Sequence, residues 1–225
     1  MNYAFSPSPI VTLPTVSGDP FPVRRIYCVG RNYAAHAKEM GIERDDPFFF
    51  MKPADAILPN GEVMPYPPGT NNLHHEVELV VALAVGGKNI PVDKANDCIY
   101  GYATGLDMTK RDVQTIAREK GQPWDMSKGF DHSAPCSAIT RVSRSGIISS
   151  GKIELKVNGK IRQSGDIGDM IWKVPETINY LSRLVELFPG DLIYTGTPAG
   201  IGPVVTGDTI EATISGLEPL TITIG

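Results

Sequence analysis

The sequence has few cysteines, no long apolar run and no concentration of basic residues, and each shortage argues against a class of protein. Its 225 residues include three cysteines, an odd number that favours reduced, buried thiols over a disulfide framework. No apolar run approaches the roughly 20 residues that a membrane-spanning helix needs. The chain carries 21 basic and 25 acidic residues without a basic block, so nucleic acid is not an expected partner.

The first 22 residues contain five prolines and no lysine or arginine, a composition that suits neither a signal peptide nor an amphipathic transit peptide. We therefore expect a cytoplasmic protein without a membrane partner. Residues 1–23 are interpreted as a loosely structured N-terminal arm with one strand near residues 10–13. Residues 24–225 contain no internal repeat, low-complexity tract or linker, so we expect them to form a single catalytic domain.

Turn-forming residues are spread along the whole chain. The 23 glycines and 19 prolines predict short strands joined by many turns rather than a helical bundle. We expect strands over residues 25–29, 48–51, 76–85, 99–106, 153–157, 160–163, 191–195, 209–214 and 220–224. Short helices are expected over residues 33–40, 110–120 and 175–187. The predicted fold class is therefore α+β, predominantly β, with a few short helices.

Two local motifs add detail to this prediction. Thr109 and Asp112 have the spacing of a capping box at the start of the second helix. Asn158-Gly159 lies between two strand segments and is a strong signal for a two-residue type I′ hairpin turn. We assign this hairpin to structure rather than to a functional site.

The segment His74-His75-Glu76-Val77-Glu78-Leu79 is the most informative part of the chain. Because side chains on a strand alternate, Glu76 and Glu78 project to the same side, where they repel each other unless a cation lies between them. The chain then becomes apolar, and Asp107 ends a second apolar stretch and can supply a third carboxylate. Oxygen ligands without cysteine suit Mg²⁺ or Mn²⁺ better than zinc. The alternative is an exposed strand whose glutamates pair with lysines.

His36 and Glu39 are the candidates for a general base. They lie three positions apart, which on a helix places them on one face. A carboxylate beside an imidazole raises its basicity and fixes its tautomer, as the activation of water requires. A surface ion pair on a short helix is the alternative. The preceding Gly30 and Arg31 favour a functional site, because arginine offers a fork for a carboxylate.

Two further segments are candidates for a substrate pocket. Lys128 follows a stretch of aromatic and small residues and could neutralise an anionic intermediate, although a surface lysine is the alternative. The glycine-rich segment 195–203 lacks the Gly-Lys-Ser/Thr ending of a phosphate-binding loop, so we expect a rigid turn that lines a pocket with Thr197. No Gly-x-Ser-x-Gly elbow or activated cysteine is present, so a hydrolase would use water as its nucleophile.

Seven short motifs follow one another along the chain. They are residues 29–40 (VGRNYAAHAKEM), 50–53 (FMKP), 74–79 (HHEVEL), 106–109 (LDMT), 111–114 (RDVQ), 121–124 (GQPW) and 195–203 (TGTPAGIGP). They occur in the order found in the fumarylacetoacetate hydrolase family, and the chain resembles the small single-domain members of that family. The resemblance extends from about residue 24 to the end and does not cover residues 1–23.

The resemblance implies mixed, rolled β-sheets of the fumarylacetoacetase C-terminal-domain type and a homodimer. It implies a Mg²⁺ or Mn²⁺ site formed by Glu76, Glu78 and Asp107. It also implies a catalytic His36/Glu39 dyad that acts together with Lys128. The remaining implied pocket residues, which would bind the substrate, are Arg31, Lys52, Gln114 and Thr197.

The reaction that the resemblance implies is hydrolysis of a C–C bond in a 2,4-dioxo acid. Such an acylpyruvate, with fumarylpyruvate as the favoured example, would give pyruvate and a carboxylic acid. The dyad would deprotonate water, and Lys128 beside the metal would stabilise the departing enolate. Oxaloacetate decarboxylation produces the same enolate without water, so it stays open as an alternative, as do isomerase and hydratase activities. A metal-stabilised binding module is the non-enzymatic alternative, which the presence of both His36 and Glu39 disfavours.

Overall fold

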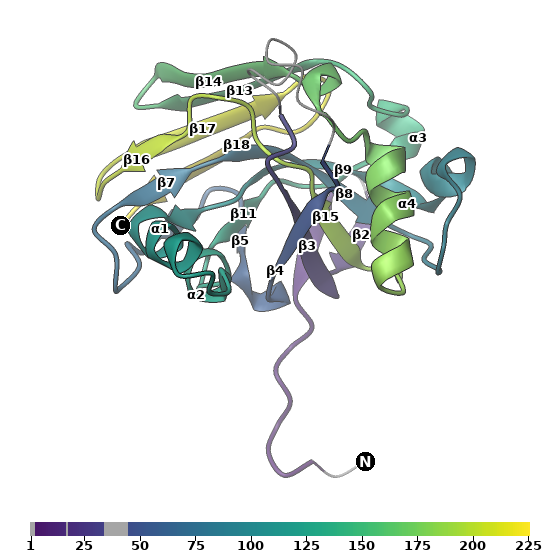
Figure 1. Cartoon of the computed structure of the whole chain (residues 1–225), viewed down its shortest axis with the longest axis horizontal. Helices are drawn as coiled ribbons and strands as arrows, with labels where there is room; N and C mark the ends of the chain where they lie inside the picture. The colour runs from purple at the N-terminus through teal and green to yellow at the C-terminus, as the bar shows by residue number, and fades with distance from the viewer. Residues whose placement is uncertain (1–2, 17, 34–44) are drawn as a thin grey trace.

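The structure is a computed structural model that describes residues 3–16, 18–33 and 45–225 (Figure 1). Strands dominate these residues and form four sheets, whereas the helices are few and short. This confirms the predominantly β, α+β fold class expected from the glycine and proline distribution. No helix in the described ranges is long and apolar enough to cross a membrane.

The largest sheet has eight strands and carries the candidate site. Its strands are β3 (Arg25–Gly30), β4 (Phe48–Lys52), β5 (Ile57–Pro59), β8 (Val77–Leu83), β9 (Ile99–Leu106), β11 (Ala134–Cys136), β12 (Thr140–Arg141) and β15 (Asp191–Tyr194). They lie in the order β4-β3-β15-β8-β9-β11-β5, and β12 pairs with β9. The sheet is mixed, because β15 runs parallel to β3 and β11 runs parallel to β5.

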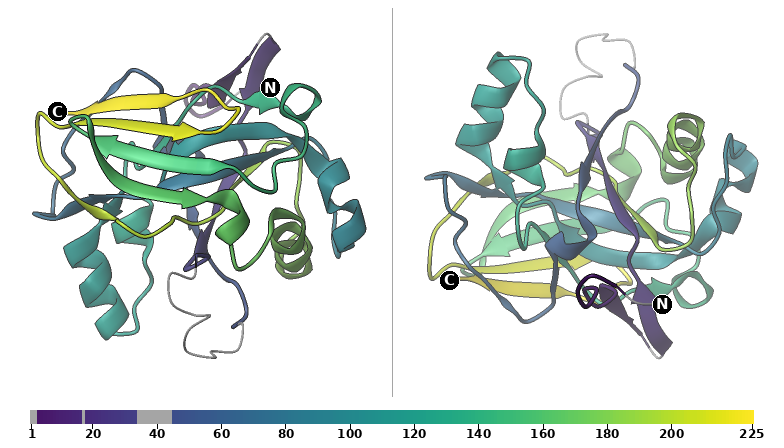
Figure 2. Two further views of the ribbon diagram at one scale, coloured as in Figure 1. Left: turned by 90° about the horizontal axis from the view of Figure 1, so that it is seen from above. Right: turned by 90° about the horizontal axis from the view of Figure 1, so that it is seen from below.

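A second sheet has five strands in the order β14-β13-β17-β18-β6. These strands are β6 (Val63–Met64), β13 (Lys152–Val157), β14 (Lys160–Asp166), β17 (Thr209–Ile214) and β18 (Leu220–Ile224). Apolar residues alternate along β17, and Ile210 and Leu155 share one buried cluster with Leu79 and Val81 of β8. Figure 2 shows the five-stranded sheet lying against the eight-stranded sheet. The two sheets therefore enclose the main core.

The other face of β8 is covered as well, which explains why this strand is apolar throughout. Val80 and Ala82 belong to a second cluster with Leu13 and Phe21 from the N-terminal stretch. Those two residues lie on an antiparallel hairpin of β1 (Thr12–Thr15) and β2 (Gly18–Pro22). The expected arm is thus limited to residues 3–10, which project from the body in Figure 1. Val11 packs against the second cluster, and its carbonyl accepts a hydrogen bond from the Val23 amide at 2.8 Å.

A three-stranded sheet borders the site. It contains β10 (Thr109–Lys110), β7 (Leu73–His75) and β16 (Gly202–Val204), in that order. Both outer strands pair antiparallel with β7. This arrangement places the end of the segment 195–203 beside the strand that precedes Glu76.

The described helices are α1 (Arg111–Glu119), α2 (Asp125–Lys128), α3 (Val142–Ser145) and α4 (Val174–Leu184), together with 3₁₀ turns at Ala54–Ala56, Val92–Cys98 and Ile167–Asp169. The capping-box prediction is wrong, because Asp112 accepts hydrogen bonds from the Thr70 hydroxyl (2.5 Å) and the Asn71 amide (3.0 Å). Helix α4 ends before the predicted Leu187, since Leu187 forms a two-way backbone bridge with Gly87. Apart from Tyr33, the predicted helix over 33–40 lies outside the described residues.

The predicted hairpin and the expected state of the cysteines are confirmed. Asn158 and Gly159 have φ values of 51° and 73°, the left-handed pair that a type I′ turn requires. The three cysteines are free and buried. Burial raises the pKa of each thiol, to about 12 at Cys136, so none has the character of a thiolate nucleophile.

Candidate metal centre and active site

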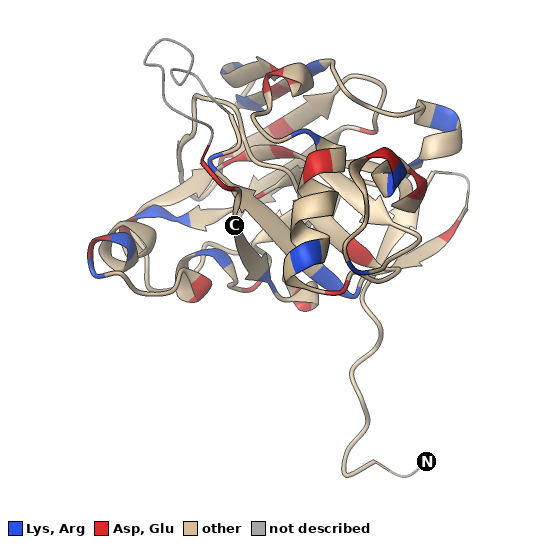
Figure 3. Ribbon diagram, turned by 45° about the vertical axis from the view of Figure 1, so that its right-hand side comes forward, with Lys and Arg blue, Asp and Glu red and all other residues tan. Residues whose placement is uncertain are grey.

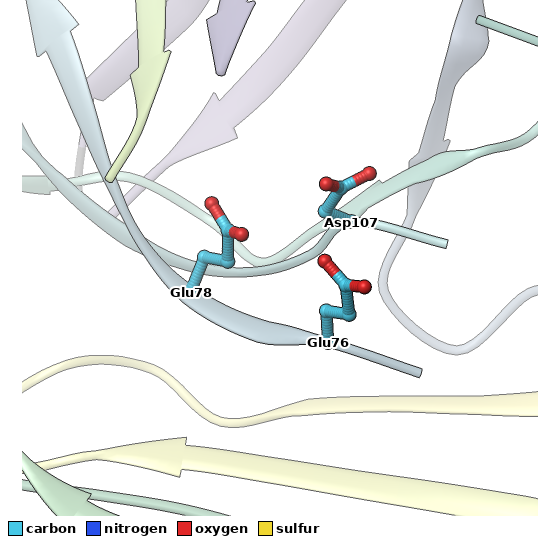
Figure 4. A group of neighbouring side chains, drawn as sticks. All are labelled: Glu76, Glu78 and Asp107. Carbon is cyan, nitrogen blue, oxygen red and sulfur yellow. The ribbon is translucent and has the colours of Figure 1, made fainter. Parts of the chain in front are cut away.

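Three carboxylates meet where β8 and β9 pair at the beginning of β8. Val77 lies opposite Leu106 in this antiparallel pair, and the Asp107 amide donates to the Glu76 carbonyl at 2.9 Å. Strand alternation places the Glu76 and Glu78 side chains on the same side, as predicted. Figure 4 shows the three carboxylates turned toward a common space, and their candidate ligand oxygens all lie within 4.8 Å of one another. All three residues are buried, with exposures of 7%, 2% and 1% in chain order.

Positively charged side chains surround two of the three carboxylates. The Lys128 ammonium lies 2.5 Å from Asp107 Oδ2 and 2.9 Å from Glu76 Oε2. Lys52 lies 2.8 Å from Asp107 Oδ1, and Arg111 pairs with Glu76 Oε1. Glu78 differs, because among the described residues no cation pairs with it and its Oε2 accepts only the Gly196 amide, at 2.8 Å. The negative charge of Glu78 is therefore the least compensated of the three.

Burial and neighbouring charges shift these groups in opposite directions. Burial raises the pKa of Glu78 well above its usual value, and the charges of Asp107 and Glu76 raise it further. Burial would also raise the pKa of Asp107, but Lys128 and Lys52 outweigh burial and lower it. For Lys128, burial would lower the pKa, but Asp107 and Glu76 outweigh burial and raise it.

These observations test whether a metal ion fits the three carboxylates. The donors are oxygen atoms without a thiolate, a set that suits a hard divalent cation. A buried carboxyl group without a cationic partner is costly to ionise unless a cation is supplied, and Glu78 has no such partner among the residues that the structure describes. The residues therefore fit a divalent ion, and the alternative of an exposed strand paired with lysines is excluded by their burial.

Lys128 is buried rather than a surface lysine, with an exposure of 2%. It is the last residue of α2, a short helix that follows the GQPW motif. Its ammonium donates to Thr109 Oγ1 at 2.6 Å in addition to the two carboxylates, so it has three acceptors for three hydrogens. Because its pKa is raised, Lys128 keeps its positive charge at neutral pH.

A cavity of about 290 Å³ opens onto the three carboxylates. Of the predicted pocket residues, Arg31, Gln114, Lys128 and Thr197 line it. Lys52 does not; its ammonium contacts Asp107 and donates to the backbone carbonyl oxygens of Met108 (3.2 Å) and Lys128. His36 and Glu39 lie outside the described residues, whereas Tyr33, immediately before that segment, lines the cavity.

The sequence reasoning missed two arginines at this cavity. Arg111, Gln114 and Arg118 are spaced at positions i, i+3 and i+7 of α1, and all three line the cavity. Helical periodicity could have identified this face once Gln114 was a candidate. Neither Arg118 nor Arg31, which has a φ of 56°, pairs with a carboxylate in the described part of the chain, and both are exposed.

The sequence reasoning also missed a buried glutamine, Gln163 of β14, which has an exposure of 0%. Its side chain bonds to His75 Nδ1 at 3.0 Å and to the Thr197 hydroxyl at 2.8 Å. His74 bonds instead to Asn72 at 2.9 Å. Strand alternation gives no signal for Gln163, because it lies beside a β-bulge.

Charged residues of both signs are interspersed over the elements in Figure 3, without a basic stripe. Residues 3–10 of the projecting arm carry no charge at all.

Comparison with known proteins gives consistent likenesses. The family pattern described as "Fumarylacetoacetate (FAA) hydrolase C-terminal" matches residues 25–225. A fumarylpyruvate hydrolase of Ralstonia sp is 44% identical over 178 residues, or 79% of this chain and 92% of that protein. The mitochondrial oxaloacetate tautomerase of Homo sapiens is 44% identical over 199 residues, or 88% and 90% of the two chains.

A solved structure shares the whole architecture. The fumarylpyruvate hydrolase of Pseudomonas aeruginosa, crystallised in complex with Mn²⁺ and pyruvate, superimposes with a TM-score of 0.95 at 49% identity. The match covers 99% of each chain. It confirms the expected fold of curled, mixed sheets.

Proposed function

The chain belongs to the fumarylacetoacetate hydrolase family, and from this premise we propose that it is a metal-dependent hydrolase of 2,4-dioxo acids. The proposed reaction cleaves a C–C bond of an acylpyruvate and releases pyruvate and a carboxylic acid. The family is enzymatic, which argues against the alternative of a metal-stabilised binding module.

The observation that carries the proposal is the buried Glu76/Glu78/Asp107 triad at a small cavity lined by Lys128. These three carboxylates would hold Mg²⁺ or Mn²⁺, and the Pseudomonas aeruginosa neighbour supports this with Mn²⁺ and pyruvate in its crystals. When bound, such an ion supplies Lewis-acid stabilisation of negative charge on the oxygens of an oxo acid.

Different residues of the chain would transfer the proton and stabilise the negative charge that develops. His36, oriented by Glu39, would take a proton from water, whose oxygen adds to the distal carbonyl carbon. The bond from that carbon to the methylene carbon then breaks, and its electron pair leaves on the pyruvate fragment as an enolate. A proton returned to the methylene carbon gives pyruvate, and the hydroxyl group remains on the acid. Lys128 supplies positive charge at the cavity wall where the enolate forms.

Two arginines that pair with no carboxylate among the described residues favour a substrate with a carboxylate at each end. Arg31 and Arg118 line the same cavity as the carboxylate triad, and neither has an anionic partner within the described ranges. Guanidinium groups bind carboxylates with two parallel hydrogen bonds. One carboxylate of a diacid would lie near the triad and the other near these arginines. This supports fumarylpyruvate over acetylpyruvate as the substrate.

Oxaloacetate is the second candidate substrate, because the human relative is an oxaloacetate tautomerase. Tautomerisation and decarboxylation of oxaloacetate both involve the enol or enolate form of an oxo acid, and neither needs water as a nucleophile. Either reaction could therefore take place in the same cavity. Lys128 would stabilise the enolate, and His36 and Glu39 would not need to activate water.

One assay separates these candidates. The purified protein with Mn²⁺ is tested on fumarylpyruvate, acetylpyruvate and oxaloacetate side by side, with and without excess EDTA. We expect metal-dependent cleavage with the highest kcat/KM for fumarylpyruvate. Turnover of oxaloacetate without cleavage of either acylpyruvate would replace the hydrolase proposal with the second candidate.

We also propose that the protein is a cytoplasmic homodimer. Exposed apolar side chains on two neighbouring elements support the dimer: Phe48 (47% exposed) and Met51 (46%) of β4, and Met126 (73%) of α2. Light scattering coupled to size-exclusion chromatography at micromolar concentration tests it, and a single monomer peak would rule the dimer out.

A further inference from the structure

Strand β14 lies at the edge of the five-stranded sheet and turns one polar side chain inward. Only Gln163 is buried on this strand, with an exposure of 0%. Its inward direction comes from a β-bulge: Lys156 pairs with Ile161 and Leu155 pairs with Gln163, so Arg162 is the extra residue. Without the bulge, Ile161 and Gln163 would share a face; with it, Ile161 is 57% exposed and Gln163 is buried. The bulge thus directs a glutamine inward and an isoleucine outward.

The Gln163 amide uses its full hydrogen-bonding capacity on two parts of the active site. Its Oε1 accepts from the Val77 amide at 3.1 Å and bonds to His75 Nδ1 at 3.0 Å. These two residues flank the carboxylate residue Glu76. Its Nε2 donates to Thr197 Oγ1 and to the Pro198 carbonyl, both at 2.8 Å. Thr197 and Pro198 belong to the cavity-lining segment 195–203.

Two backbone partners fix the orientation of this amide. The Val77 N–H can only donate and the Pro198 carbonyl can only accept, so Oε1 must face the first and Nε2 the second. The Thr197 hydroxyl oxygen must then accept a hydrogen from Nε2. Its own hydrogen has no acceptor in the described part of the chain and is available to a ligand in the cavity.

We propose that Gln163 is a positioning residue: it orients the Thr197 hydroxyl as a donor to the substrate and couples the segment 195–203 to the two residues on either side of Glu76, His75 and Val77. This inference rests on the proposed function for the substrate contact of Thr197. The close packing of the segment against β14 supports it. A Cβ on Gly165 would come within 2.9 Å of Pro198, and Gly200 has a φ of +98° and lies against the Arg162 carbonyl.

A double-mutant cycle tests the coupling. The variants are Gln163→Met, Thr197→Val and the double variant, each saturated with Mn²⁺ and assayed for kcat and KM with fumarylpyruvate. We expect each single substitution to lower kcat/KM by roughly tenfold or more. Because Gln163 acts through Thr197, the double variant should be no more than about threefold worse than Thr197→Val alone. The proposal would be overturned if the losses of kcat/KM in the two single variants multiplied in the double variant. It would also be overturned if Thr197→Val did not lower kcat/KM.

Gln163→Glu tests the acceptor and donor roles of the Gln163 amide separately. When ionised, a carboxylate at this position keeps the acceptor for Val77 and His75 and loses both donors to the segment 195–203. Because burial at this position raises the pKa of a carboxyl group, Mn²⁺ affinity and kcat/KM are both measured at neutral and at higher pH. We expect Mn²⁺ affinity close to wild type, measured by the electron paramagnetic resonance signal of free Mn²⁺, with kcat/KM lowered as in Gln163→Met. The control is Ser164→Asp, which adds the same charge at the exposed neighbouring position and should change neither quantity. Weakened Mn²⁺ binding with an unchanged kcat/KM at saturating metal would contradict the inferred role.

Failure of this inference can be told apart from failure of the proposed function. If the wild type cleaves no acylpyruvate, the proposed function fails, and the cycle is measured on the Kd of pyruvate for the Mn²⁺-loaded protein by calorimetry. Non-additive changes in that Kd would support the positioning role on their own. Additive or absent changes would refute it.

Discussion

The floor and the rim of the cavity both carry charged residues, but their charges are balanced differently. The floor consists of Glu76, Glu78 and Asp107 with the buried Lys128 and the half-buried Arg111, and Lys52 pairs with Asp107 without lining the cavity. The rim consists of Arg31 and Arg118, which are exposed and have no anionic partner in the described ranges.

This difference follows from the cost of burying charge. A buried ion without a partner costs several kcal/mol, so Glu76 and Asp107 of the floor are stabilised by cations, whereas in the described part of the chain Glu78 is not. An exposed guanidinium keeps its hydration and needs no partner for folding. Substitutions in the floor should therefore weaken metal binding, and those that remove the partner of a buried cation should also lower stability. Substitutions in the rim should affect substrate choice alone.

The largest expected effect comes from removing the proposed metal or one of its ligands. Excess EDTA should abolish turnover, and Mg²⁺ or Mn²⁺ should restore it. Glu76→Gln and Glu78→Gln should each weaken metal binding by roughly 100-fold or more, to judge from the 10–100-fold cost of losing even an outer-sphere partner. Full activity in EDTA would show that the triad is not a metal site.

The same two variants also differ in their expected effect on stability, because Glu76 pairs with cations and Glu78 pairs with none within the described ranges. Glu76→Gln leaves Lys128 and Arg111 with less negative charge around them, so the melting temperature of the metal-free protein should fall. Glu78→Gln replaces a buried carboxyl group whose raised pKa disfavours its charge and with which no cation pairs among the described residues, so the metal-free protein should be as stable as wild type or more stable. Equal destabilisation by both would contradict the charge assignment.

The next largest effect is expected from removing the proposed general base, His36. His36→Ala should lower acylpyruvate cleavage by about 10²–10⁴-fold, the usual contribution of a general base. Any turnover of oxaloacetate should fall less, because it needs no activated water, whereas Lys128→Ala should lower both activities. The measurement is kcat/KM for each substrate with metal occupancy checked. If His36→Ala lowered kcat/KM equally for acylpyruvate and oxaloacetate, the dyad would act in a step that both reactions share.

A smaller effect is expected at the rim. Arg118→Gln should lower kcat/KM for fumarylpyruvate by roughly 10–100-fold, which corresponds to one charge-assisted hydrogen-bonded contact of about 1.5–3 kcal/mol. Acetylpyruvate has no distal carboxylate, so its kcat/KM should stay within about threefold of wild type by the same reasoning. The melting temperature should not change. Arg118→Lys is the matched variant and should restore part of the activity. A loss that is equal for both substrates would place the distal carboxylate elsewhere.

The sequence predicted the floor better than the rim, for physical reasons. Strand alternation is short-ranged and regular, so it identified Glu76 and Glu78, and the end of an apolar strand identified Asp107. The burial of Lys128 depends on how α2 packs, which no local pattern reports. Asp112 had the spacing of a capping residue, but its carboxylate accepts hydrogen bonds from Thr70 and Asn71 instead.

The elements missed by the sequence reasoning depend on pairings between distant segments. Gln163 faces the site only because a bulge interrupts the alternation of β14, and a bulge is set by the partner strand. The short strands β7, β10 and β16 were not predicted either, since each exists only through its neighbours in the three-stranded sheet. The position of Arg118 was accessible from helical spacing.

The smallest expected effect lies outside both floor and rim, at the hairpin turn. Gly159 has a φ of 73°, and a Cβ there would meet nothing within 4 Å, so substitution adds backbone strain without a clash. Gly159→Val should lower the free energy of unfolding by about 1–2 kcal/mol, or the melting temperature by roughly 2–8 °C. Gly159→Asn is the matched control and should retain more of the stability, because asparagine tolerates the left-handed conformation. Neither variant should change KM in the folded fraction, even though Gln163 lies on the same strand, because the bulge and the pairing with β13 hold the register beyond the turn. A selective rise in KM at unchanged stability would show that the turn transmits strain to Gln163, and the hairpin would then belong to the active site.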